Sequence, residues 1–204
     1  MLAATLLFGY LLGAIPSGAI VARVYGRVDL TQVGSRRTGA TNVLRTLGLG
    51  AAAIVFVADC LKGSAAVALA SSISDGDPWA RALAGGAAVF GHAYSPFIGF
   101  KGGRGVVSGF GSSLIIAPLA GAVGLLAALS VTAATRYVSL GSLVGTIVCA
   151  FVIVLLVFTA GQPLANVGFA VVVGAFIIVA HRDNISRVLR GTERRLGEPA
   201  ELGS

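Results

Sequence analysis

Long apolar runs alternate with short polar clusters along the 204 residues of the chain. A helix rises about 1.5 Å per residue, so about 20 residues cross the roughly 30 Å hydrocarbon core of a bilayer. Most of the apolar runs are that long, and the pattern therefore predicts an all-α integral membrane protein. The runs are 2–25, 49–73, 79–98, 105–117, 118–135, 138–159 and 163–181.

The stretch from Gly105 to Thr135 is too long for one comfortable span and short for two. Pro118 divides it, and proline is accepted at the start of a helix but not easily inside one. One helix here would give six spans, whereas two helices, the first of them short, would give seven.

The polar residues fall into three groups: cluster one (Gly34–Arg45), cluster two (His92–Arg104) and cluster three (His181–Arg195). Seven spans place all three on one membrane face, whereas six would put cluster three on the opposite face. Seven spans also gather almost all arginines on one side, as the positive-inside rule requires, and leave Arg81 outside. We therefore predict seven transmembrane helices, one of them short, with the N-terminus outside and the C-terminus cytoplasmic.

The expected organisation is a single polytopic membrane domain over 1–195 and a polar C-terminal tail over 196–204. The segment after Arg190 should extend the last helix and fray. Charged residues make up 11% of the chain, far below the roughly 25% of soluble domains. The net charge of +7 fits membrane topology and attraction to anionic headgroups, and without interleaved aromatic residues it does not indicate nucleic acid.

Cluster one combines two glycines with small hydrogen-bonding side chains, namely Ser35, Thr41 and Asn42. Arg45 follows, and its guanidinium can hold a phosphate or carboxylate with two parallel bonds. We assign Ser35 and Arg45 to a functional site. Arg36 and Arg37 are explained equally well as topology-determining charges beside a span.

Cluster two contains a glycine-rich loop that leads into a helix and includes Lys101, Gly102, Gly103 and Arg104. Backbone amides at a helix N-terminus form a natural phosphate site. The spacing matches neither a Walker loop nor a dinucleotide fingerprint. His92 lies about two turns before the end of its span, where it faces either a cavity or a hydrogen-bonded structural environment.

Cluster three places His181 and Asn184 three residues apart, on one face of a helix. Histidine can move a proton or donate a hydrogen bond near neutral pH. An amphipathic surface helix would explain the outer arginines without any catalytic role. Ser139 and Ser142 begin the sixth span on the cytoplasmic side, where a helix N-terminus also favours an anion.

Within the second span, Asp59 and Lys62 are predicted to form an intramembrane ion pair, because either charge alone would be costly there. Carboxylates are otherwise few and scattered, which argues against a metal site, and no G-x-S-x-G elbow occurs. A metal-free and cofactor-free site that holds phosphate by basic, hydroxyl and backbone donors fits best.

Together the three clusters resemble the three motifs of the bacterial acylphosphate-dependent glycerol-3-phosphate acyltransferases, the PlsY family. The matching segments are Gly34-Ser35, Gly39-Ala40-Thr41-Asn42, Arg45, Gly91-His92, Phe100–Gly105, His181-Arg182, Asn184-Ile185 and Arg187. Two segments depart from the family pattern. Arg36 and Arg37 stand where Gly-Asn is usual, and Arg104 stands where Lys is usual, so positive charge is kept or added.

The resemblance implies a seven-span enzyme that transfers a long-chain acyl group from acyl phosphate to the 1-hydroxyl of glycerol 3-phosphate. The products would be lysophosphatidic acid and phosphate, and the enzyme would need no metal or cofactor. It also implies a bacterial inner-membrane protein that works as a monomer, with its active site facing the cytoplasm. His181, Asn184 and Ser35 would be catalytic. Substrate would be bound by Arg45, Lys101, Arg104, Gly102, Gly103, Thr41, Asn42, Ser142 and His92.

Two other classes of membrane protein compete with this interpretation. A small transporter of organic anions would also carry polar residues within its spans, but related halves with paired broken helices are not visible. A CDP-alcohol phosphotransferase would need a dense aspartate motif, which the chain lacks.

Overall fold

The computed structural model describes residues 2–198, all of whose regular elements are helices. The first apolar run forms two helices, α1 and α2, and each of the other six forms one. Two further short helices, α3 and α10, carry polar clusters. The helices are α1 (Leu2–Ala14), α2 (Ser17–Gly26), α3 (Ala40–Leu47), α4 (Leu49–Ile73), α5 (Pro78–Ala93), α6 (Val106–Ile116), α7 (Pro118–Thr135), α8 (Val138–Ala160), α9 (Ala165–Ala180) and α10 (Arg182–Leu189). A short 3-10 turn, η1, covers Pro96–Ile98.

Four segments are long and apolar enough to cross a membrane: α1 with α2, α4, α7 and α8. The pair α9 and α10 would be a fifth, although it is bent by 57° between the two helices. The prediction of an apolar all-helical protein is thus confirmed. The division at Pro118 is also confirmed, because α6 ends at Ile116 and α7 begins at the proline.

The first apolar run is broken, which the hydrophobic pattern did not predict. α1 ends at Ala14 and α2 begins at Ser17, with Pro16 between them. The freed carbonyl groups are satisfied by side chains from α4 and from the loop after α5, since Lys62 Nζ donates to Ile15 O (2.9 Å) and Ser95 Oγ donates to Ala14 O (2.6 Å). A helix break inside an apolar bundle needs such partners, because unpaired carbonyls there are costly.

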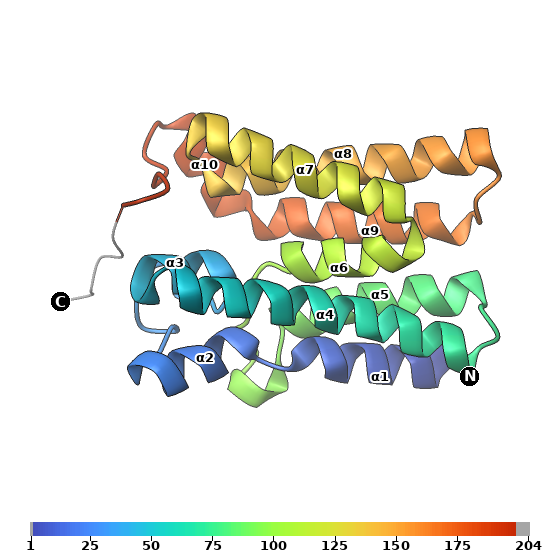
Figure 1. The fold of residues 1–204 in the computed structure, drawn as a ribbon, viewed down its shortest axis with the longest axis horizontal. Coiled ribbons are helices and arrows are strands. Elements are labelled where there is room, and N and C mark those ends of the chain that lie inside the picture. The colour runs from blue at the N-terminus through green and yellow to red at the C-terminus, as the bar shows by residue number, and fades with distance from the viewer. Residues whose placement is uncertain (1, 199–204) are drawn as a thin grey trace.

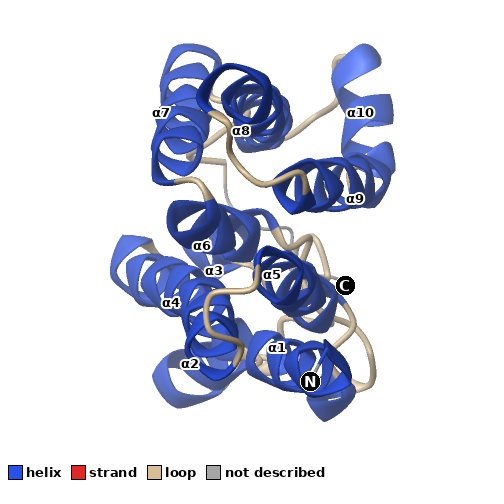
Figure 2. Cartoon of the chain, turned by 90° about the vertical axis from the view of Figure 1, so that its right-hand side faces the viewer, coloured by secondary structure: helices blue, strands red, loops and turns tan. Residues whose placement is uncertain are grey.

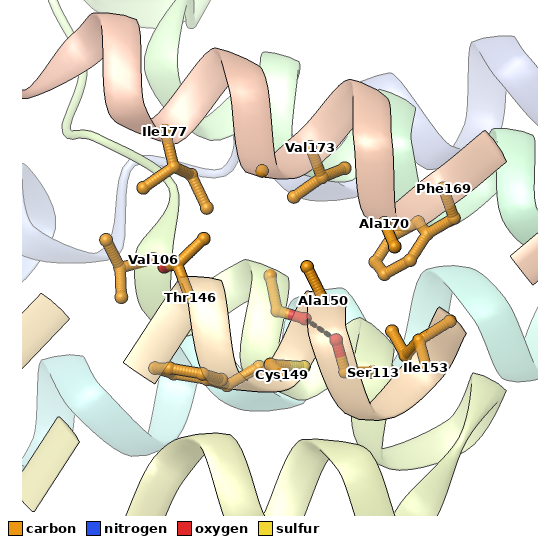
Figure 3. A pocket seen from close by; sticks show the side chains of 13 residues that line it. Val106, Ser113, Thr146, Cys149, Ala150, Ile153, Phe169, Ala170, Val173 and Ile177 are labelled. Atoms are coloured by element: carbon orange, nitrogen blue, oxygen red, sulfur yellow. Dashed lines mark hydrogen bonds between the residues drawn. The ribbon is translucent and has the colours of Figure 1, made fainter. Parts of the chain in front are cut away.

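The short helix α6 lies at the centre of the molecule. It lies between α4 and α7, while α5 packs directly against α9 (Figures 1 and 2). Small residues let it approach α4 closely, because a Cβ at Gly111 would overlap the carbonyl oxygen of Cys60. Between α6, α8 and α9 the apolar core is nearly filled and leaves a cavity of only about 20 Å³, lined by residues that include Phe110, Cys149 and Val173 (Figure 3).

Helices α3 and α10, which carry clusters one and three, lie at the same end of the bundle, opposite the start of α1 (Figure 1). The expected helical extension beyond Arg190 is wrong, because α10 ends at Leu189 and the following segment is not helical and crosses the same end of the bundle (Figure 1). There the amide of Leu196 donates to Arg136 O (2.6 Å), and Arg136 Nη2 donates to Leu196 O (2.7 Å). The rest of the predicted tail, 199–204, lies outside the described residues.

Candidate active site

A cavity of about 550 Å³ brings the three polar clusters together. It lies between α3, α4, α6, α7 and α8, and it also reaches the junction of α9 and α10. Most of the predicted site residues line it, and Arg37 lines it as well. Its polar side chains are Ser35, Arg37, Thr41, Asn42, Asp59, His92, Arg104, Thr132, Ser142 and His181, and Gly103 also lines it.

The remaining walls of this cavity are apolar. The helix α4 contributes Ala53 and Phe56, α6 contributes Val107, and α7 contributes Leu125 and Leu129. Leu129 is largely exposed on the surface of the bundle, where lipid would surround an apolar helix. The cavity therefore offers a polar end and an apolar groove, which suits a molecule with a charged head and a hydrocarbon chain.

Asn42 organises the loop of cluster one. Its side-chain nitrogen lies 2.9 Å from Arg37 O and 3.1 Å from Val33 O, and its Oδ1 accepts the amide of Ser35 (3.1 Å). These bonds occupy most of the hydrogen-bonding capacity of the Asn42 amide. Asn42 thus shapes the loop that presents Ser35 to the cavity.

In cluster two, the amides of Gly102 and Gly103 are already used. They donate to Ala93 O (3.0 Å) and His92 O (3.2 Å), the last carbonyl groups of α5. The amides still available are those at the start of α6, since Val106 and Val107 have no preceding helical carbonyl to pair with. Any anion at this loop would therefore meet the N-terminus of α6 rather than the two glycines.

Arg104 extends from this loop across the cavity to α9. Its Nε donates to Ala180 O (3.1 Å), at the C-terminal end of that helix. Burial lowers the pKa of Arg104 to about 10, and the positive charges of Arg37 and Arg187 add to the shift. Positive charge is therefore concentrated here, and an anionic ligand would relieve the repulsion.

His181 is buried at the bend between α9 and α10. Its Nδ1 lies 2.8 Å from Ile177 O, and because a carbonyl oxygen can only accept, Nδ1 carries the hydrogen. Burial, followed by the positive charge of Arg104, lowers the pKa of His181 to about 4. The ring is therefore neutral near pH 7, and its Nε2 is left as a hydrogen-bond acceptor.

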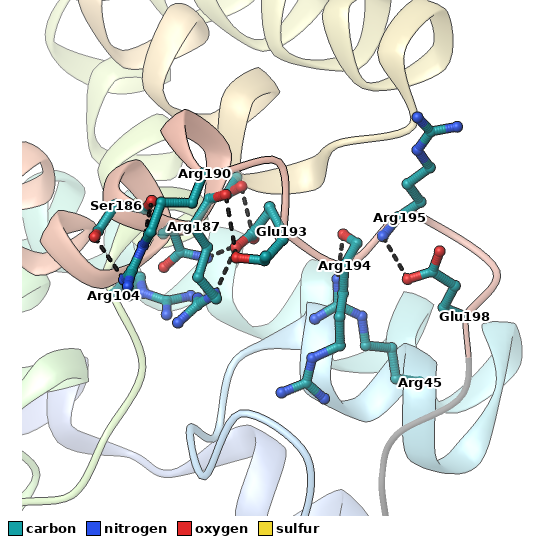
Figure 4. Close-up of polar contacts among 12 residues, drawn as sticks. Arg45, Arg104, Ser186, Arg187, Arg190, Glu193, Arg194, Arg195 and Glu198 are labelled. Carbon is teal, nitrogen blue, oxygen red and sulfur yellow. Dashed lines mark hydrogen bonds and ion pairs between the residues drawn. The ribbon is translucent and has the colours of Figure 1, made fainter.

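Glu193 is an organising residue that the sequence interpretation missed. Its Oε1 accepts from Asn184 Nδ2 (2.7 Å) and Ser139 Oγ (2.8 Å), and its Oε2 accepts from Arg187 Nε (2.7 Å; Figure 4). Burial alone would raise the pKa of Glu193, but these hydrogen bonds outweigh it and hold the pKa below its usual value. An acid between the arginines of cluster three, with Asp183 as the other acid of that cluster, was the available sequence clue.

Four predicted site residues do not line the cavity: Arg45, Lys101, Gly102 and Asn184. Arg45 lies beside the C-terminal segment, where its Nη2 donates to Arg194 O (3.2 Å; Figure 4), and burial lowers its pKa. Lys101 is exposed. Asn184 is buried against Glu193, and its Oδ1 has no hydrogen-bond partner within residues 2–198.

Known proteins of one family match almost the whole chain. The family model for glycerol-3-phosphate acyltransferases matches residues 3–191 of the chain. The glycerol-3-phosphate acyltransferase of Rubrobacter xylanophilus is 45% identical over 94% of this chain and 93% of that protein. The one of Thermus thermophilus is 46% identical over 97% of this chain and 96% of its own length.

Solved structures agree with the sequence matches. The fold is similar to the crystal structure of PlsY, an integral membrane glycerol 3-phosphate acyltransferase, in its glycerol 3-phosphate form. The TM-score is 0.87 and the identity 40%, with 96% of each chain covered. The lysophosphatidic acid form of PlsY gives a TM-score of 0.85 at 39% identity, covering 96% of this chain and 95% of that one. The chain therefore belongs to the glycerol-3-phosphate acyltransferase family.

Proposed function

We propose that this acyltransferase takes its acyl group from a long-chain acyl phosphate and transfers it to the 1-hydroxyl of glycerol 3-phosphate. The cavity with one polar end and one apolar groove is the observation that carries the proposal. Both substrates are anions, and one of them has a long hydrocarbon chain. The solved relatives in glycerol 3-phosphate and lysophosphatidic acid forms support the same acceptor and product for this chain.

Arg104, the start of α6 and the hydroxyl groups of Ser35 and Thr41 would bind the phosphate groups. Arg37 would add positive charge, and Ser142 would contribute a hydroxyl from α8. The acyl chain would lie along the groove between α4 and α7. The main catalytic task is to bring two mutually repelling anions together in a site that excludes water. Cationic side chains that are already held in place stabilise both anions without having to move during the reaction.

The transfer itself is proposed to be direct. The glycerol 3-phosphate hydroxyl oxygen attacks the carbonyl carbon, a new ester bond forms, and the bond from that carbon to the phosphate oxygen breaks. The hydroxyl proton ends on the departing phosphate, so inorganic phosphate leaves. Neutral His181 would accept a hydrogen bond from the attacking hydroxyl through Nε2, and Asn184 with Glu193 would hold α10 in place.

The same proposal includes a membrane arrangement. We infer seven crossings, made by α1 with α2, α4, α5, α6, α7, α8 and α9, with the N-terminus outside and the polar end of the cavity facing the cytoplasm of a bacterial inner membrane. Cytoplasmic arginines at that end obey the positive-inside rule. We also infer a working monomer built from a single domain, 1–195.

The proposal is tested with purified protein in detergent, given palmitoyl phosphate and glycerol 3-phosphate with EDTA present. We expect release of inorganic phosphate and formation of lysophosphatidic acid in equal amounts. Turnover with palmitoyl-CoA but not with palmitoyl phosphate would contradict the proposed donor. Uptake of either anion into proteoliposomes without phosphate release would favour the transporter instead.

A further inference from the structure

A buried polar cluster lies next to the cavity, where α4, α5 and the break between α1 and α2 meet. Asp59 is 1% exposed, His92 7% and Lys62 8%. Asp59 Oδ1 accepts from Lys62 Nζ (2.8 Å) and from Ser17 Oγ, and it lies 3.4 Å from His92 Nδ1. The predicted ion pair is therefore confirmed, and it includes a histidine that the sequence interpretation had treated separately.

His92 connects this cluster to the glycine-rich loop. The carbonyl of His92 accepts the amide of Gly103 (3.2 Å), and the next carbonyl, of Ala93, accepts the amide of Gly102 (3.0 Å). The ring packs directly on the loop, because a Cβ at Gly103 would overlap Nε2 of His92. His92 Nδ1 is buried and has no hydrogen-bond partner within residues 2–198. The carboxylate of Asp59, 3.4 Å away, is therefore the group whose negative charge can orient the ring.

We propose that Asp59 is a positioning residue for acyl transfer, because it holds His92 in the orientation that fixes the turn at Gly102 and Gly103. That turn sets where Arg104 and the first amides of α6 lie. This inference rests on the proposed function, which assigns Arg104 and the start of α6 to a substrate phosphate. Asp59 and His92 line the same cavity as Arg104, so a movement of the ring would reach the anion site directly.

Part of this cluster stabilises the helix bundle, and the test must separate that role from the positioning of His92. Lys62 and Ser95 satisfy the carbonyl groups at the helix break, at Ile15 and Ala14. Loss of these bonds would weaken the bundle without moving His92. Asp59 differs because it contacts His92 as well as Lys62.

The experiment uses the double variant Asp59→Asn/Lys62→Met, because removing both charges leaves no unpaired ion in the bundle. We expect the KM for glycerol 3-phosphate to rise about tenfold, with kcat reduced less than threefold. Ser95→Ala is the matched control. It removes one bond at the same break and should lower the melting temperature while leaving this KM unchanged.

A second variant, His92→Phe, covers the case in which the double variant fails to fold. Phenylalanine keeps a ring against Gly103 but lacks the Nδ1 atom that lies 3.4 Å from Asp59. The same rise in KM is expected. A wild-type KM in His92→Phe, or in a folded double variant, would overturn the positioning role.

Amide hydrogen exchange of the peptide 99–105 gives a result independent of catalysis. Exchange should be faster in both variants than in the wild type, with no change in the loop 161–164. If the wild type fails to use glycerol 3-phosphate but the loop still loses protection in the variants, the proposed function falls while the positioning of the loop stands. Unchanged exchange in folded variants would overturn the inference.

Discussion

Arginine side chains crowd the polar end of the cavity with little compensating negative charge. Arg37 and Arg187 both lower the pKa of Arg104, whose burial is the larger cause. Glu193 is the buried carboxylate of cluster three, and its oxygens already accept from Arg187, Asn184 and Ser139. Positive charge that the nearby carboxylates do not neutralise favours the binding of dianionic phosphate groups.

Replacing Arg104 tests this field. Arg104→Met should lower kcat/KM for glycerol 3-phosphate by about a hundredfold, because a buried charge-assisted contact to an anion is lost. Arg104→Lys should lose less, about tenfold, since the charge stays but the Nε bond to Ala180 O does not. Steady-state kinetics measures both.

Arg182→Ala is the control for these variants, because the Arg182 side chain is 75% exposed and meets only the exposed Asp183. Its kinetics should match the wild type. Equal losses in Arg182→Ala and Arg104→Met would show that general surface charge, rather than the cavity, attracts the substrate.

The low pKa of His181 makes stability depend on pH. The unfolded pKa is about 6.5, and the folded pKa is about 4. The unfolded chain therefore binds a proton in this window that the folded chain does not, and stability falls as pH drops from 6.5 towards 4. From pH 7 to pH 5 this group should cost roughly 2 kcal/mol of the free energy of unfolding.

His181→Gln should show a shallower pH dependence of the melting temperature than the wild type over the same range. Glutamine keeps a hydrogen-bonding side chain but does not titrate. Identical slopes for the two proteins would mean that His181 is not held neutral by burial.

At the scale of residues, the sequence could identify groups by their chemistry but not by their partners. Ser35, Arg104 and His181 were found because hydroxyl, basic and imidazole side chains stand out beside apolar spans. Asn42 holds the loop of cluster one, and Glu193 links α8 to α10, through hydrogen bonds that form only after folding. Such contacts have no local pattern.

At the scale of elements, the apolar groove between α4 and α7 should determine the preference for acyl-chain length. Ala53→Phe would fill part of it from the α4 side. We expect the KM for palmitoyl phosphate to rise about tenfold and that for octanoyl phosphate less than threefold, since each buried CH2 contributes about 0.8 kcal/mol to binding.

Leu61→Phe is the matched control, because Leu61 lies on α4 but is 61% exposed and does not line the cavity. It should leave both KM values unchanged. Equal effects on long and short donors in Ala53→Phe would contradict the assignment of the groove to the acyl chain.

Helix positions were predictable because hydrophobic runs and prolines report them directly. The start of α7 at Pro118 follows from the chemistry of proline. The break at Pro16 was not predictable in the same way. Its carbonyl groups depend on Ser95 and Lys62, which come from far along the chain.

At the scale of the whole molecule, the number of membrane crossings decides whether cluster three lies on the same membrane face as clusters one and two. Gln162→Cys, in a background of Cys60→Ala and Cys149→Ala, distinguishes the two topologies. With seven crossings the loop 161–164 is outside and should react with a membrane-impermeant maleimide in intact cells. With six it would be cytoplasmic and protected.

Gln32→Cys in the same background is the control, because it lies before α3 on the cytoplasmic side in either topology. It should react only after the membrane is permeabilised. Labelling of Gln32→Cys in intact cells would contradict the proposed orientation.

Direct transfer within one cavity is tested most sharply by a single-turnover experiment. Enzyme in excess is mixed with radiolabelled palmitoyl phosphate, first alone and then with glycerol 3-phosphate. We predict no phosphate release and no labelled protein from the donor alone, followed by equal and simultaneous formation of phosphate and lysophosphatidic acid once the acceptor is added. A burst of phosphate from the donor alone, with the label attached to the protein, would contradict it.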